Sequence, residues 1–243
     1  MKSPVNSFCA RVLLIPFVLG AAFAQAPAGN WFRVRRGSLC VTEGTIGETV
    51  GDRLSVNVPK MRAYVNTWAS QAIELRFTYG GPTQKKVALG SGEMRQQFGL
   101  KLRAQDACNL VYAMWRVEPE SKLVVSVKRN PRAHTSAACG ERGYEDLTPQ
   151  RASDLPRLRP GESHTLRAEM KKEELQVFID DREVWAGEVG PDAATLEGPV
   201  GIRSDNAQLQ FELKAGEYAG IHPNFVLDCK SAERATRLSR RPY

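Results

Sequence analysis

Apolar and polar residues alternate over many short segments of this chain, and no other feature limits its fold so strongly. In "AIELRFTYGG", Ile73, Leu75, Phe77 and Tyr79 alternate with more polar residues. Alternation or short apolar runs also mark "RLSVNV", "QFGLKLRA", "CNLVYAMWRV", "KLVVSV", "HTLRAEM", "ELQVFI" and "LQFELK". A period of two is typical of strands with one buried face, and no long window has convincing helical periodicity. The sequence therefore predicts an all-β, single-domain antiparallel sandwich or barrel over residues 25–229.

The first 24 residues are predicted to be a secretory signal peptide. Lys2 and Arg11 precede an apolar run, and Ala22-Phe23-Ala24 has the small-x-small pattern of a cleavage site. A short membrane anchor is the alternative, but a spanning helix needs about 20 apolar residues. We therefore expect a secreted or periplasmic protein with no membrane span.

Four cysteines follow the predicted signal peptide: Cys40, Cys108, Cys139 and Cys229. Four cysteines allow three pairings, and disulfides are the default in an oxidising compartment. Proximity in the sequence favours Cys108–Cys139, which leaves Cys40–Cys229 to join the two ends of the domain. The competing zinc site would lack any CxxC spacing, so we predict no metal and no cofactor.

The formal net charge is +7, but it is concentrated at the two ends of the chain. The segment "KSAERATRLSRRPY", residues 230–243, carries five basic residues and one acid. Such a tail is predicted to be disordered, although it could also hold anionic glycans or a bacterial surface. Because the predicted domain is close to neutral, the sequence gives little support to nucleic-acid binding. It does not indicate an oligomeric state.

Residues 163–218 resemble a known superfamily. "HTLRAEMKKEELQVFIDDREVWAGEVG" and "GPVGIRSDNAQLQFELKAGEY" are similar to the last strands of concanavalin A-like lectin/glucanase sandwiches, including laminin-G-like domains and the secreted 3-keto-disaccharide hydrolase domain. The resemblance implies a jelly-roll sandwich whose concave sheet and rim loops form the binding cleft. The usual Asp-Gly hairpin turn is Asp181-Arg182 here, and Arg would be strained at positive φ. We therefore predict a longer turn centred on "DDRE".

The sequence does not show the carboxylate run of the superfamily's retaining glucanases. Those enzymes place two carboxylates about 5–5.5 Å apart. The nearest candidates here are Glu118 and Glu120, in a predicted turn around Pro119, and the acids between Glu141 and Asp146. No G-x-S-x-G elbow is present. We therefore name no catalytic residue.

A long polar stretch, "KRNPRAHTSAACGERGYEDLTPQ", follows the most apolar strands. If Cys139 bonds to Cys108, this stretch becomes a rim loop that is pinned to the sheet and carries function on a rigid scaffold. An ordinary solvated insertion is the alternative. We predict a saccharide cleft in which Trp115 stacks against a sugar. If the strand faces the other way, Trp115 packs in the core and Arg116 replaces it. The remaining candidate binding residues are Lys128, His134, Arg142, Tyr144, Arg203 and Asp205, of which the last two could instead form a local salt bridge.

Three functions remain open from the sequence. The first is a non-catalytic, lectin-like module that binds oligo- or polysaccharides. The second is a glycoside-processing hydrolase similar to the 3-keto-disaccharide domain. The third is an extracellular protein-interaction domain. Side chains that line the concave face would separate them, because paired carboxylates favour an enzyme and an aromatic platform with polar groups favours a lectin.

Overall fold

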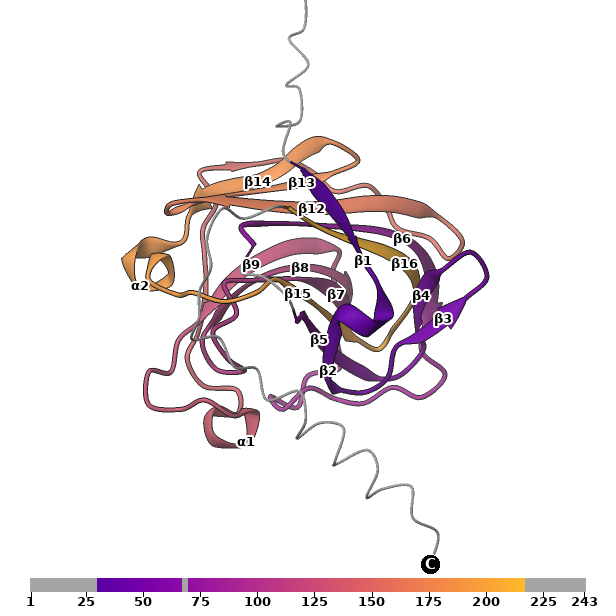
Figure 1. Ribbon diagram of the computed structural model, residues 1–243, viewed down its shortest axis with the longest axis horizontal. Helices are drawn as coiled ribbons and strands as arrows, with labels where there is room; N and C mark the ends of the chain where they lie inside the picture. The colour runs from indigo at the N-terminus through magenta and orange to yellow at the C-terminus, as the bar shows by residue number, and fades with distance from the viewer. Residues whose placement is uncertain (1–29, 67–69, 217–243) are drawn as a thin grey trace, which may run out of the picture.

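Two antiparallel sheets pack face to face in the computed structural model, which describes residues 30–66 and 70–216 (Figure 1). The nine-stranded sheet contains, in spatial order, β11 (Arg151–Ala152), β14 (Arg182–Glu188), β13 (Glu174–Ile179), β12 (Ser163–Lys171), β6 (Ala72–Pro82), β16 (Ala207–Gly216), β4 (Arg53–Val56) and β3 (Gly47–Thr49), with β1 (Trp31–Val34) also paired to β16. The predicted all-β sandwich is confirmed.

The seven-stranded sheet carries the candidate site. Its spatial order is β10 (Tyr144–Asp146), β9 (Lys122–Lys128), β8 (Leu110–Glu118), β7 (Gln96–Leu102), β15 (Gly201–Asp205), β5 (Lys60–Val65) and β2 (Leu39–Glu43). Helical turns occur at η1 (Arg36–Ser38), α1 (Ser136–Cys139) and α2 (Gly190–Ala194). In Figure 1, α1 lies on the side of this sheet that faces away from the nine-stranded sheet.

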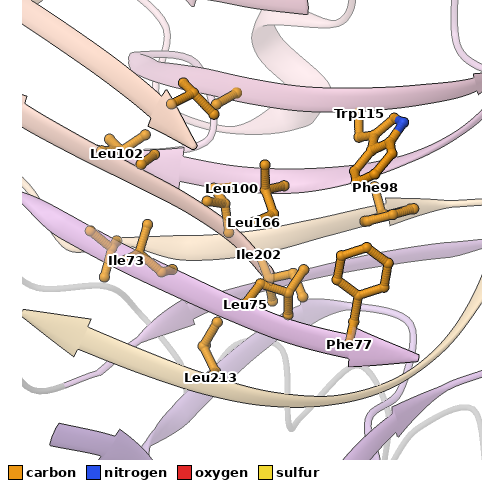
Figure 2. Close-up of a cluster of buried hydrophobic side chains, with 14 of the residues drawn as sticks. Ile73, Leu75, Phe77, Phe98, Leu100, Leu102, Trp115, Leu166, Ile202 and Leu213 are labelled. Atoms are coloured by element: carbon orange, nitrogen blue, oxygen red, sulfur yellow. The ribbon is translucent and has the colours of Figure 1, made fainter. Parts of the chain in front are cut away.

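The core lies between the two sheets and is built by the alternating apolar residues. Ile73, Leu75 and Phe77 of β6 are fully buried, as are Leu100 of β7 and Leu213 of β16 (Figure 2). A fully buried side chain of this size contributes about 1.5–3 kcal/mol. The faces predicted from the period of two are therefore confirmed for these strands.

Trp115 is part of this core, so the prediction that it faces a cleft is wrong. Its side chain is 0% exposed, and its ring centroid lies 5.9 Å from those of both Phe77 and Phe98 (Figure 2). Both faces of β8 are apolar over "VYAMW", so the alternation could not decide which face packs inward. The stated alternative holds, because Trp115 points inward and Arg116 lies on the outer face.

Asn206 connects the two sheets between β15 and β16. Its φ is 56°, in the left-handed region that Asn tolerates better than most residues. Its side chain is 0% exposed, accepts a hydrogen bond from the Val87 amide, and donates to the carbonyls of Val87 and Arg95. Asn206 therefore holds the β6–β7 connection, residues 83–95, against the end of β15.

The β13–β14 hairpin has its turn at Asp180 and Asp181, with φ of 50° and 63°. The predicted longer turn centred on "DDRE" is wrong, because Arg182 already begins β14. Asp180 compensates for its strained conformation by accepting hydrogen bonds from the Thr165 amide and the His164 ring. Aspartate, whose short side chain can bond locally, replaces the glycine that such turns usually need.

The predicted Cys108–Cys139 disulfide is confirmed, and it closes a separation of 31 residues. Cys40 is also disulfide-bonded, but its predicted partner, Cys229, lies outside the described residues. The same is true of the predicted signal peptide (1–24), the basic tail (230–243) and both ends of the predicted domain. Within the part of the chain that the structure covers, no helix is long and apolar enough to span a membrane.

Candidate functional site

A groove runs over the outer face of the seven-stranded sheet, on the side away from the core. It consists of a small half of about 360 Å³ and a large half of about 670 Å³. Both halves share Leu89, Tyr112, Glu141, Tyr144 and Arg203. The small half is also lined by Arg95, Gln97, Met114, Arg116, Ser126 and Asp146. The large half is also lined by Arg62, Tyr64, Lys101, Asp106, Lys128 and His134.

Strand register determines the order of side chains on the groove floor. One row of cross-strand neighbours runs from Tyr112 through Lys101 and Gly201 to Tyr64. The next row runs from Met114 through Gly99 and Arg203 to Arg62. Lys101 and Arg203 each have a glycine as a lateral neighbour, which leaves room for their long side chains to lie along the sheet.

Asp205 lies beneath the groove and holds two guanidinium groups. It is 0% exposed and accepts hydrogen bonds from Arg62 Nη2 at 2.6 Å, Arg203 Nε at 2.8 Å and Gln97 Nε2 at 2.8 Å. Burial alone would raise the pKa of this carboxyl, but Arg203 and Arg62 hold it at about 2. Asp205 thus positions Arg203, which lines both halves, while remaining out of the groove itself.

Three tyrosines on the outer face are each paired with a cation. Lys101 Nζ lies 3.8 Å from the centroid of the Tyr64 ring, and Lys128 Nζ lies 4.7 Å from that of Tyr144. The Arg203 guanidinium lies 5.2 Å from the Tyr112 ring. Each distance is within the range of a cation–π interaction. The cations therefore occupy aromatic faces that would otherwise be free for a ligand.

Tyr144 links the edge of the sheet to the centre of the groove. Its ring stacks on Tyr112, with centroids 5.9 Å apart, and its hydroxyl accepts a hydrogen bond from Arg203 Nη1 at 3.2 Å. Burial raises the pKa of Tyr144, and so does the neighbouring Tyr112. The phenol therefore stays protonated at neutral pH and can offer its own O–H to a ligand.

The connection that follows β9 forms one wall of the large half. Lys128 Nζ donates to the Gly140 carbonyl at 2.6 Å, and His134 Nδ1 lies 2.8 Å from Asp106 Oδ2. Arg142 is an exception among the predicted site residues. It bonds the carbonyls of Ala138 and Cys139 at the end of α1 and does not line either half.

The eight predicted residues therefore separate into three groups. Arg116, Lys128, His134, Tyr144 and Arg203 line the groove. Asp205 forms the local salt bridge that we gave as the alternative, and it supports the floor from below. Trp115 and Arg142 are outside the groove.

Sequence reasoning missed Arg62, Tyr64, Lys101 and Tyr112, which make up much of the floor. Lys101 and Arg62 occupy the polar positions of alternating segments, and such residues usually face solvent. The signal that could have identified them is the pair of glycines, Gly99 and Gly201, in otherwise regular strands. Glycine within a strand often marks a close approach of backbone or ligand.

The groove contains carboxylates, but the candidate pair in the β8–β9 turn is not among them. Glu118 lies 3.2 Å from Lys86 Nζ, and Glu120 lies 2.8 Å from Lys122 Nζ, outside the groove. Glu141 and Asp146 do line the small half. Among the side chains that the structure describes, no three His, Cys, Asp or Glu residues gather as metal ligands would.

Comparisons with solved structures agree with this architecture. The structure resembles the carbohydrate binding module CBM66 from Bacillus subtilis, with a TM-score of 0.51 and 16% identity over 74% of this chain and 96% of that one. It also matches a putative glycosyl hydrolase from Parabacteroides distasonis (TM-score 0.47, 11% identity, 77% of this chain and 100% of that one). A third match is the Emp46p carbohydrate recognition domain (TM-score 0.47, 11% identity, 76% and 90%).

These likenesses concern the fold. The likeness to CBM66 supports the β-sandwich fold that the sequence predicted. No family model matches the sequence, and no curated protein matches it either.

Proposed function

We propose that this protein binds a saccharide chain in the groove on the outer face of its seven-stranded sheet. The observation that carries the proposal is the composition of the groove, where polar donors and acceptors surround a central aromatic pair. Arg203, Lys128 and Ser126 offer donors, Glu141 and Asp146 offer acceptors, and all of them line one groove. Sugar hydroxyls need both kinds of partner, fixed on a rigid surface.

The rigidity of the groove also supports this function. The floor consists of paired strands, and one wall is fixed by the Cys108–Cys139 disulfide. The other wall is the β6–β7 connection, which Asn206 holds through three hydrogen bonds. A pre-organised site loses little conformational entropy when a flexible oligosaccharide binds. CBM66, which shares the fold, is named as a carbohydrate binding module.

We also propose that the protein acts outside the cytoplasm, as a secreted or periplasmic protein. The support is the signal-like N-terminal sequence together with disulfide-bonded Cys40, Cys108 and Cys139. Disulfides persist in oxidising compartments and are rare elsewhere.

Our first choice is binding without turnover. A glycoside hydrolase is the second candidate, and one observation favours it: Glu93, Glu141 and Asp146 all line the small half. Glu93 is paired with Arg95, which leaves Glu141 and Asp146 as the pair to test. Incubation of the protein with each bound oligosaccharide, followed by chromatography of the products, distinguishes the two candidates. Cleavage that disappears in Glu141→Gln or Asp146→Asn would replace the first choice with the second.

The test of binding uses an array of neutral and acidic oligosaccharides with wild type and two variants. Tyr144→Ala removes one of the two rings that line both halves and should reduce binding at least tenfold. Phe178→Ala is the matched control, because Phe178 lies on the outer side of the opposite sheet, under Arg167. Thermal melts of both variants check that they are folded. Absence of glycan binding by the wild type, or equal loss in both variants, would contradict the proposal.

A further inference from the structure

Lys101 lines the large half of the groove, and its ammonium group lacks a described partner that could accept a hydrogen bond. Its side chain is 1% exposed, and its ammonium contacts the face of the Tyr64 ring. Within residues 30–66 and 70–216, the ammonium group of Lys101 forms no hydrogen bond and no ion pair. Burying an ammonium group without an acceptor is costly. This unfavourable burial of Lys101 occurs at a position that lines the groove.

The surrounding charges make the position of Lys101 still less favourable for an isolated cation. The charges of Arg62 and Arg203 act on Lys101, and both guanidiniums pair with the buried carboxylate of Asp205. Lys128, on the other side of Tyr112, bonds only the neutral carbonyl of Gly140. The floor therefore holds four cations against one carboxylate.

Three carboxylates line the rim of the large half, and none of them pairs with Lys101: Glu141 acts on Lys128, and the other two are Glu43 and Asp106. Glu43 lies 3.8 Å from Arg62 and is half-exposed, and Asp106 is bound to His134 and to Asn109. Burial lowers the pKa of Lys101 well below its ordinary value, and so do Arg62 and Arg203, against the opposing effect of Glu43 and Asp205. The charged form of Lys101 is thus unfavourable in the empty groove, and a bound anion would favour it.

The aromatic rings on the floor are also arranged for a polar ligand. Lys101, Arg203 and Lys128 lie against the rings of Tyr64, Tyr112 and Tyr144 respectively. Each of these three rings in the groove therefore has a cation close to it. An oxyanion suits such a floor, because carboxylate and sulfate oxygens accept several charge-assisted hydrogen bonds at once.

We propose that the large half of the groove recognises an oxyanion carried by a saccharide, a uronate carboxylate or a sulfate ester, with Lys101 as its central contact and Arg62, Arg203 and Lys128 around it. This inference rests on the proposed function, since it names the class of glycan that the same groove takes. The oxyanion supplies the acceptor that Lys101 lacks and the negative charge that the floor lacks. The neutral part of the saccharide continues into the small half.

The experiment measures the affinity of wild type for three matched probes by calorimetry. Oligogalacturonate carries carboxylates, sulfated oligogalactan carries sulfate esters, and carboxyl-reduced oligogalacturonate carries no charge. We expect at least tenfold tighter binding of one acidic probe than of the neutral one, and the preferred acidic probe identifies the oxyanion. Poly-glutamate is a control for nonspecific attraction, and equal binding of poly-glutamate would overturn the proposal.

Lys101→Met removes the charge and keeps an unbranched side chain. It should weaken binding of the acidic probe at least tenfold and binding of the neutral probe by a much smaller factor. Lys171→Met is the matched control, because Lys171 is exposed at the end of β12 in the other sheet. Lys101→Met should melt at or above the wild-type temperature, since it removes a buried amine that has no acceptor among the described residues. Lys128→Met provides a second variant and should weaken binding of the acidic probe by a larger factor than binding of the neutral probe.

The failure of this inference is distinguishable from the failure of the proposed function. If wild type prefers the neutral probe, or if Lys101→Met keeps its affinity for the acidic probe, the oxyanion site is wrong and the glycan groove stands. If wild type binds none of the three probes and no glycan on the array, both are wrong.

Discussion

Asp205 and Arg203, two residues apart in β15, form an ion pair with 2.8 Å between Oδ2 and Nε. In a strand, alternate residues share a face, so the carboxylate and the guanidinium both lie on the outer side of the sheet. Asp205 is covered completely, whereas Arg203 reaches the groove. Asp205 therefore fixes the position of the Arg203 side chain, and Arg203 offers hydrogen-bond donors to a ligand.

Replacement of this carboxylate should be strongly destabilising. Asp205→Asn leaves the guanidiniums of Arg62 and Arg203 with no buried counter-charge, which costs about 3 kcal/mol in comparable buried pairs. Denaturant unfolding measures the change. Glu43→Gln is the control, since Glu43 is a half-exposed partner of Arg62 and its loss should cost below about 1 kcal/mol. Equal effects of the two substitutions would contradict the role given to Asp205.

The pH dependence of stability should report the same carboxylate. Its folded pKa of about 2 is below the ordinary value of 3.8. A depressed pKa gives stability that is present above the ordinary value and is lost as the pH falls toward 2. The difference in unfolding free energy between wild type and Asp205→Asn should therefore shrink below about pH 4. Parallel curves over that range would show that Asp205 is not the titrating group.

Trp115 should behave as a core residue in both stability and binding. Trp115→Ala is expected to lose about 3–5 kcal/mol of unfolding free energy, because it leaves a cavity beside Phe77 and Phe98. Trp115→Phe fills much of that space and should remain folded. Its affinity for any glycan that wild type binds should be unchanged. Loss of glycan binding by a Trp115→Phe variant with a wild-type melting temperature would restore the original cleft assignment.

The Cys108–Cys139 disulfide should contribute to stability mainly by restricting the unfolded chain. For a loop of 31 residues, the chain-entropy model gives about 3–4 kcal/mol. We expect Cys108→Ala/Cys139→Ala to lose a stability of that order. Hydrogen exchange should also rise in β10, because the wall that precedes it is no longer pinned to β8. A double variant with unchanged exchange in residues 129–146 would argue that the loop is held by its hydrogen bonds alone.

Asn206 should control the order of the other wall. Asn206→Gly keeps a residue that accepts the positive φ but removes three hydrogen bonds to the β6–β7 connection. At about 1 kcal/mol for each lost bond, we expect about 2–3 kcal/mol of destabilisation. The Val87 amide should exchange faster, which mass spectrometry can detect. Gln208→Ala, which removes one exposed hydrogen bond to Pro82, is the control.

The sequence predicted the fold well because the property that defines it is local. A period of two in β6, β12 and β16 identified their buried faces without any knowledge of neighbouring strands. The same rule failed on β8, where both faces are apolar and only packing against Phe77 and Phe98 selects Trp115 for the core. The turn at Asp180 and Asp181 was misplaced by one residue, since Asp can adopt positive φ when it finds local hydrogen bonds.

The site was predicted less completely because it depends on strand order. Lys101 and Arg203 come from strands that are adjacent in space and about 100 residues apart in the sequence. Arg62 joins them from a third strand. Lys128 at the end of β9, His134 in the connection that follows and Tyr144 at the start of β10 could be predicted because one disulfide places their segment on the sheet. No comparable local signal indicates which polar residues of β5, β7 and β15 face one another.

The two floor glycines have a consequence for how such a protein can diverge. A side chain at Gly99 would place its Cβ 2.2 Å from the Ala113 carbonyl oxygen, and one at Gly201 would place it 2.3 Å from that of Ala63. Backbone atoms cannot move aside as a flexible side chain can, so both positions are fixed by the sheet and not by any ligand. Among descendants of this sequence, we therefore expect the two glycines to persist while Lys101, Arg62 and Lys128 vary with the molecule each one recognises. The sheet would then act as a constant frame on which recognition changes one long side chain at a time.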